Sequence, residues 1–104
     1  MIGRLQSVRK RSIEKQIPFD LDKKWMSEKL NIKNCEVSNI LCDHDKGVWY
    51  TQSIDRTDNN GGYTKDNCKM VIWGLNVGKG QNCSYEEIYK IAKGFIEQYD
   101  RKNI

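Results

Sequence analysis

The chain has 104 residues with a formal charge of +4; 38% of them are hydrophobic and 10% are aromatic. This composition indicates one domain with a modest core and excludes a disordered chain. No apolar run approaches the roughly 20 residues of a membrane span, and the first residues lack the apolar segment of a secretory signal. We therefore expect a cytoplasmic protein without membrane contact, whose mild positive charge is compatible with a polyanionic partner.

The N-terminal part predicts two helices. In residues 2–16 the apolar residues form a partial helical stripe: Ile2, Leu5, Val8 and Ile13. Pro18 ends this segment, because proline restricts the residue before it. Asp20 or Asp22 can cap a second helix that runs to about Leu30. Its apolar face consists of Leu21, Trp25, Met26 and Leu30.

Basic residues crowd the first fifteen positions against a single acid, Glu14: Arg4, Arg9, Lys10, Arg11 and Lys15. Such a cluster is either a solvated helix face or a surface that contacts phosphates. The residues alone leave both interpretations open.

The segment 31–47 carries turn residues and two candidate short strands, 35–37 and 40–42. Its Asp43-His44-Asp45 triplet contains the only histidine of the chain. One interpretation is a polar hairpin turn. The other makes His44 a general base, since histidine titrates near neutral pH, and requires it to fold back beside Asp55.

Residues 48–54 alternate and are rich in β-formers, so they predict a strand that leads into Asp55. An ordered loop, a second strand at 68–72 and a short helix at 73–79 follow. Ser84 and Glu87 fit a capping box, and apolar residues at three- and four-residue steps extend a helix to about Tyr99. We expect this amphipathic helix to cover the strand–strand–helix unit and complete the core.

The four cysteines are widely spaced and form no C-x-x-C pair: Cys35, Cys42, Cys68 and Cys83. A structural Zn²⁺ site is therefore not expected, and disulfides are rare in cytosolic chains. Free thiols, mostly buried, are the expectation.

The densest run of acids, amides and turn residues is Ser53 to Lys79. A strand that carries Asp55, a tight loop, a second strand and a helix that carries Asn76 would bring these two side chains together. One carboxylate and one amide oxygen that face water suit a hard divalent cation such as Mg²⁺.

Three motifs in this run carry a family resemblance: Ser53-Ile54-Asp55-Arg56-Thr57-Asp58, Gly62-Tyr63-Thr64-Lys65-Asp66-Asn67 and Asn76-Val77-Gly78-Lys79. They resemble the HNH endonucleases, in the variant common among phage-type proteins, and segments 17–21 and 35–38 resemble that family's lead-in. The resemblance implies an α+β fold with a small ββα-metal core (about 46–80), a helical lead-in (1–31) and a covering helix (about 84–100). It also implies a phage or bacterial origin.

The same resemblance implies a nuclease that uses one Mg²⁺ or Mn²⁺ ion to hydrolyse phosphodiester bonds of DNA, most simply double-stranded. By position, Asp55 and Asn76 would hold the metal and Asn67 would brace the loop. Arg56 stands where the family has its base histidine; because arginine does not deprotonate, it would bind phosphate or stabilise charge. Water activation would then fall to His44, Tyr63 or solvent.

The residues expected to contact nucleic acid are Arg4, Arg9, Lys10, Arg11, Lys65, Lys69 and Lys79. The alternative is an HNH-like scaffold that has lost catalysis and binds nucleic acid, or inhibits a partner protein, because a fold does not guarantee its usual chemistry.

Overall fold

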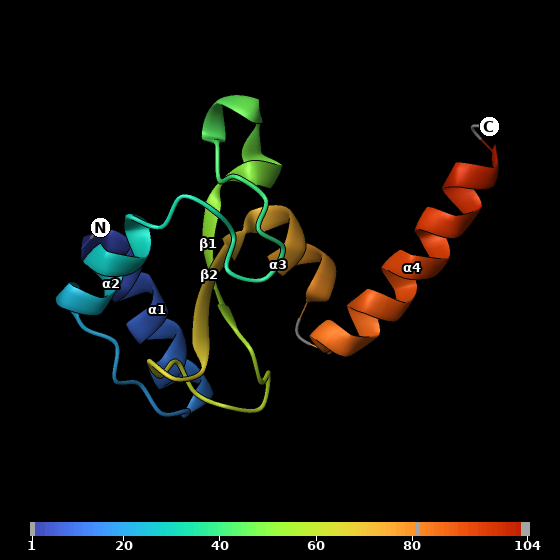
Figure 1. The fold of residues 1–104 in the computed structure, drawn as a ribbon. Coiled ribbons are helices and arrows are strands. Elements are labelled where there is room, and N and C mark those ends of the chain that lie inside the picture. The colour runs from blue at the N-terminus through green and yellow to red at the C-terminus, as the bar shows by residue number, and fades with distance from the viewer. Residues whose placement is uncertain (1, 81, 103–104) are drawn as a thin grey trace.

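Helices and a small sheet form the body of the protein, and one long helix extends from it (Figure 1). The structure, a computed structural model, describes residues 2–80 and 82–102. Its elements are the helices α1 (Ile2–Lys15), α2 (Lys23–Leu30), α3 (Trp73–Lys79) and α4 (Tyr85–Lys102), the 3₁₀ turns η1 (His44–Lys46) and η2 (Val48–Tyr50), and the strands β1 (Gln52–Arg56) and β2 (Cys68–Ile72). This is the α+β class that the sequence predicts.

The two N-terminal helices form where they were expected. Asp22 caps α2 by accepting a hydrogen bond of 2.8 Å from the backbone N–H of Trp25. Trp25 and Met26 are buried in the main core with Val8 of α1. Ile13, expected on the apolar stripe of α1, is instead 67% exposed. The stripe therefore turns away from the core before α1 ends.

Strands β1 and β2 pair antiparallel, with Asp55 opposite Lys69. β2 and α3 have the expected bounds, but β1 begins at Gln52 rather than at Val48. Residues 48–50 form the turn η2 because Gly47 adopts φ 120° before them and the Thr51 N–H and hydroxyl both bond to the Val48 carbonyl. The β-forming residues of this turn pack outside the sheet, where the ring centroids of Trp49 and Trp73 are 5.0 Å apart.

The segment before η1 contains one isolated bridge, between Asn34 and Leu41, in place of the two short strands that were expected. A turn with Asn39 at φ 61° folds the chain back on itself. Glu36 then ties this turn to β2, because its N–H donates to the Met70 carbonyl and its carboxylate accepts from the Met70 N–H. The segment is thus held by β2 edge contacts rather than by its own ladder.

The lead-in chain is fastened to the loop between the strands. Phe19 and Tyr63 form a parallel bridge, and the Tyr63 N–H donates to the Pro18 carbonyl at 2.9 Å. Gly62 permits this approach, since a Cβ there would lie 2.4 Å from the Pro18 carbonyl oxygen. Residues of the lead-in and of the two strands, among them Leu21, Ile54 and Met70, consequently share one core.

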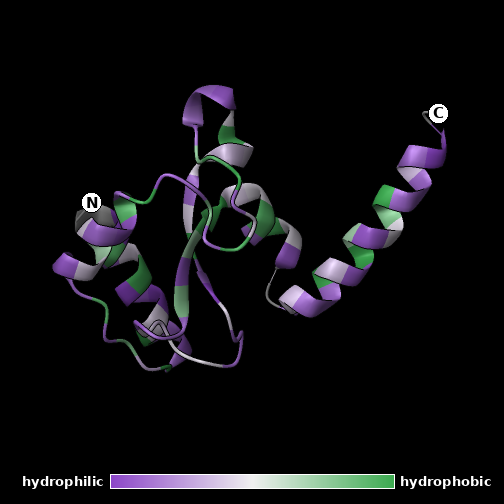
Figure 2. Ribbon diagram, in the orientation of Figure 1, coloured by the Kyte–Doolittle hydropathy of each residue, from purple (hydrophilic) through white to green (hydrophobic). Residues whose placement is uncertain are grey.

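The long helix α4 does not cover the sheet, and the expectation that it completes the core is wrong. Ser84 caps it as predicted, with the Glu87 N–H donating to the Ser84 hydroxyl, and that hydroxyl donates in turn to the Glu87 carboxylate; but α4 projects away from the body (Figure 1). The radius of gyration is 15.1 Å, against about 13 Å for a compact chain of this length. Apolar residues band this projecting helix (Figure 2). Among the described residues, no helix is both long and apolar enough to cross a bilayer.

Candidate metal and nucleic-acid site

Asp55 and Asn76 line the same cavity, of about 290 Å³. Asp55 comes from β1 and Asn76 from the middle of α3, which follows β2 without a loop. The strand–loop–strand–helix order therefore brings together two side chains that are 21 residues apart. The other lining residues include basic side chains from α1 and β1: Arg11, Lys15 and Arg56.

Asn76 is fixed by two hydrogen bonds from its amide nitrogen. The nitrogen donates to the Ser53 hydroxyl at 2.6 Å and to the Ile54 carbonyl at 3.3 Å. Both acceptors belong to β1, so the contacts hold α3 against the strand that carries Asp55. This leaves the amide oxygen as the atom of Asn76 that is suited to a cation.

Asp55 is buried, with 5% of its surface exposed, and both of its carboxylate oxygens have partners. Lys79 Nζ forms an ion pair with Oδ1 at 3.4 Å. The Tyr85 hydroxyl, from the first turn of α4, donates to Oδ2. A carboxylate oxygen has two acceptor lone pairs, so each keeps one acceptor position after these contacts.

Lys79 is 1% exposed, and this corrects its assignment as a nucleic-acid contact. Besides the ion pair, Nζ donates to the Arg56 carbonyl at 2.7 Å and to Asn59 Oδ1 at 2.6 Å. Its three donors are thus directed at the end of β1 and the loop beyond it. The N-x-x-K motif places this lysine inside the protein, where it neutralises Asp55.

Tyr85 joins the projecting helix to the site. Its burial raises the pKa of its hydroxyl above the ordinary value of 10.0, and the hydrogen bond to Asp55 raises that pKa further. The hydroxyl therefore stays protonated and remains a donor to the carboxylate. This contact was not expected from the sequence, because Tyr85 there is only the first apolar residue of an amphipathic helix.

Tyr63 lies between two guanidinium groups. Arg56 is 5.0 Å and Arg11 is 5.7 Å from its ring centroid, distances typical of cation–π contacts. Arg56 also donates to the Gly61 carbonyl at 2.9 Å, which fixes its direction. The two arginines come from α1 and β1, and both line the cavity that holds Asp55.

Asn67 connects the two ends of the loop. Its side-chain oxygen accepts from the Asp58 N–H, and its amide nitrogen donates to the carbonyls of Asp58 and Gly62. These are the contacts of a loop brace, the part that the family resemblance gives to this position. Asn67 does not line the cavity of Asp55.

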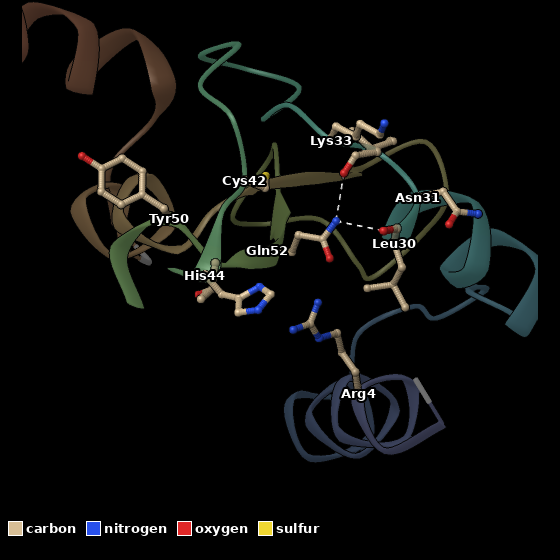
Figure 3. A pocket seen from close by; sticks show the side chains of 10 residues that line it. Arg4, Leu30, Asn31, Lys33, Cys42, His44, Tyr50 and Gln52 are labelled. Atoms are coloured by element: carbon tan, nitrogen blue, oxygen red, sulfur yellow. Dashed lines mark hydrogen bonds between the residues drawn. The ribbon is translucent and has the colours of Figure 1, made fainter. Parts of the chain in front are cut away.

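His44 lies elsewhere. It is in the exposed turn η1, where it pairs with Asp45 at 3.6 Å, and it borders a different cavity with Arg4 and Gln52 (Figure 3). The cavity of Asp55 and Asn76 has no histidine in its lining. Asp43–Asp45 thus belong to a polar turn, as one interpretation expected, but not to a hairpin between strands, and the structure does not bring His44 beside Asp55.

The remaining candidate cations divide into two groups. Arg4 and Arg11 line a second cavity that also includes Asn76, so one face of α1 is directed at the site. The others are exposed and line neither cavity: Arg9, Lys10, Lys65 and Lys69. Lys65 pairs with Asp22 at 2.7 Å, and the hydrogen bond from this pairing raises its pKa. Lys15, a member of the N-terminal basic cluster that was left out of the expected nucleic-acid contacts, joins Arg11 in the cavity of Asp55 and Asn76.

One carboxylate and one amide are a sparse set of metal ligands. They fit a hydrated Mg²⁺ or Mn²⁺ ion, which takes few protein ligands and keeps several waters. Within residues 2–80 and 82–102, no three His, Cys, Asp or Glu side chains form a metal-binding group. The four cysteines are free thiols; Cys35 and Cys68 are buried, and burial raises the pKa of Cys68 to about 12.

Comparison with known proteins adds no relative: no protein-family model matches the chain, and neither curated proteins nor solved structures give a match.

Lys79→Met should lower the free energy of unfolding by about 3–5 kcal/mol, because it leaves the buried Asp55 carboxylate without its cation. Urea titration measures the loss. Lys69→Met is the matched control, since Lys69 is exposed, and it should stay within about 0.5 kcal/mol of the unaltered protein. Equal losses in the two variants would contradict the assignment of a buried pair.

Stability should fall as the pH rises above 10. The unfolded chain releases the Tyr85 proton there, whereas the folded state keeps it because its pKa is raised. The contribution is therefore complete below pH 10 and is lost on the alkaline side. In Tyr85→Phe the fall should be smaller, as measured by urea unfolding between about pH 8 and pH 11. Tyr89→Phe, at an exposed position, should leave it unchanged.

Proposed function

We propose that the protein is a divalent-metal-dependent DNA endonuclease of the HNH-like, ββα-metal type. The observation that carries the proposal is the shared cavity of Asp55 and Asn76, whose wall includes Arg11, Lys15 and Arg56. A carboxylate and an amide beside three cations provide both a place for a metal ion and a place for the phosphate it would act on.

The basic residues bind and orient the DNA backbone. Arg56 is held by the Gly61 carbonyl and the Tyr63 ring, so its guanidinium has a fixed direction and loses little freedom on binding phosphate. Arg11 and Lys15 reach the same cavity from α1. Cations from two elements that line one cavity can hold a strand beside Asp55 and Asn76, which is the main requirement for positioning a phosphodiester.

Asp55 and Asn76 would hold the metal through a carboxylate oxygen and an amide oxygen. When bound, the metal would stabilise negative charge on the phosphate and on the leaving oxygen. Lys79 and Tyr85 orient the Asp55 carboxylate through the ion pair and the hydrogen bond. Arg56 does not take up a proton, so the attacking water loses its proton to solvent or to a phosphate oxygen.

A second function is a nucleic-acid-binding module that does not cut. The observation in its favour is that Lys79 and Tyr85 already engage both oxygens of Asp55, and a neighbouring ammonium opposes the binding of a cation. Arg56 stands where the resembled family has its base histidine, and this also favours a module that binds without cutting. The basic wall of the cavity serves binding in either case.

Plasmid DNA incubated with the protein and Mg²⁺ or Mn²⁺ should be nicked or linearised, and EDTA should stop the reaction. Asp55→Asn and Asn76→Ala should each lower the rate by roughly a hundredfold or more, since they remove the proposed ligands of the metal. Agarose gels give the rates. Asp45→Asn, at an exposed site in η1, is the control and should cut as the unaltered protein does.

If the Asp55→Asn variant still cuts DNA, the proposed metal site is wrong. Loss of cutting in His44→Ala would show that His44, rather than solvent or a phosphate oxygen, activates the water. Binding of DNA with no cutting under any metal would favour the second function. A thermal unfolding transition in each variant separates loss of chemistry from loss of fold.

Binding to duplex DNA without metal should weaken with salt. Arg11→Ala and Lys15→Ala should each reduce the slope of log affinity against log salt by about one, because each removes one phosphate contact. Fluorescence anisotropy over a series of salt concentrations measures the slope. Lys24→Ala changes an exposed lysine of α2 outside the cavity and should leave the slope unaltered.

A further inference from the structure

The helix α4 presents a broad apolar face to solvent. Its apolar residues recur at steps of three and four: Tyr85, Ile88, Ala92, Phe95 and Tyr99. Three more widen the face on its two sides: Tyr89, Ile91 and Ile96. None of these side chains is buried, and Phe95 is 66% exposed. Figure 2 shows apolar positions between polar ones through the middle of the projecting helix.

This face requires a partner. A helix of 18 residues, about 27 Å long, is marginal in water without tertiary packing. In the described part of the chain α4 meets the body near its first turn, where Tyr85 reaches Asp55. Beyond that turn, Phe95 and Tyr99 of α4 pack on each other, with their ring centroids 5.8 Å apart. Exposed apolar surface of this extent marks an interaction site.

We propose that α4 pairs antiparallel with α4 of a second copy of this chain. The charges at the two ends of the helix favour this partner and this direction. The first turn carries Glu86 and Glu87, and the last turn carries Arg101 and Lys102. Antiparallel pairing sets the acidic end of one helix against the basic end of the other, whereas parallel pairing would set like charges together.

The sizes of the side chains fit the same arrangement. A twofold axis between residues 93 and 94 places Ala92 of one copy opposite Phe95 of the other, a small residue against a large one. It also places Ile88 opposite Tyr99. Such a face is self-complementary, as a twofold interface must be. Three exposed aromatics and two isoleucines would contribute on the order of 500 Å² per copy, enough for a modest dimer.

The polar face of α4 argues against a membrane or a nucleic acid as the partner. It carries four acids, Glu86, Glu87, Glu97 and Asp100, and four bases, Lys90, Lys93, Arg101 and Lys102, so its charges cancel. Helices that lie on anionic membranes carry an excess of Lys and Arg on this face. Binding of nucleic acid also needs a positive surface.

Sedimentation velocity over a range of concentrations should show a reversible monomer–dimer equilibrium. Phe95→Glu should weaken dimerisation by at least about tenfold, because it places a charge in the apolar seam. Lys93→Gln, on the polar face, is the control and should dimerise normally. The body should keep its cooperative unfolding transition in both variants, since neither side chain contributes to the cores.

A charge exchange tests the direction of pairing. Changing Glu86 and Glu87 to Lys should weaken the dimer, and adding Arg101→Glu and Lys102→Glu in the same chain should restore it. Restoration by the fourfold variant supports antiparallel pairing, and a dimer that ignores these charges overturns it. A protein that stays monomeric at every concentration overturns the proposal. Monomers that bind phosphatidylserine vesicles through α4 would assign the face to lipid instead.

Discussion

The buried ion pair between Asp55 and Lys79 connects the parts of the molecule that form the candidate site. Lys79 lies at the end of α3, and its ammonium bonds to the last residue of β1 and to Asn59 in the loop. On the other oxygen of Asp55, Tyr85 brings in the start of α4. Strand, loop and two helices therefore meet at one carboxylate. A charge in the interior is tolerated there because each of its oxygens has a donor.

The same contacts create a tension in the candidate site. A carboxylate that is paired and hydrogen-bonded is well oriented for a metal ion, but it is already partly neutralised. The cavity beside it is open and carries Arg11, Lys15 and Arg56, so it favours anions over cations. A phosphate bound in the cavity would change this balance, because its oxygens add negative charge and can serve as further ligands of the metal. Phosphate and metal would then bind together more readily than either alone.

Much of the local structure follows from the sequence. α3 and both caps, at Asp22 and at Ser84, lie where short-range rules put them, because hydrogen bonds between near neighbours define them. β2 also has its expected bounds, although its hydrogen bonds run to β1. The start of β1 does not, since Gly47 and the bonds to the Val48 carbonyl override the β-propensity of residues 48–50. Lys79 was taken for a surface cation because nothing in a basic chain distinguishes a lysine whose partners are 20 and 24 residues away. The amphipathic pattern of α4 predicted a helix correctly but not its partner, as periodicity reveals an apolar face and not what covers it.

The contact of Pro18 and Phe19 with Gly62 and Tyr63 limits how early the chain can fold during its synthesis on the ribosome. The lead-in cannot settle until residue 63 has left the exit tunnel, because its bridge partner does not exist before then. Until that moment Val8, Trp25 and Met26 have no sheet to pack on. The apolar sides of α1 and α2 thus stay uncovered by the sheet until β1 and β2 have both been synthesised.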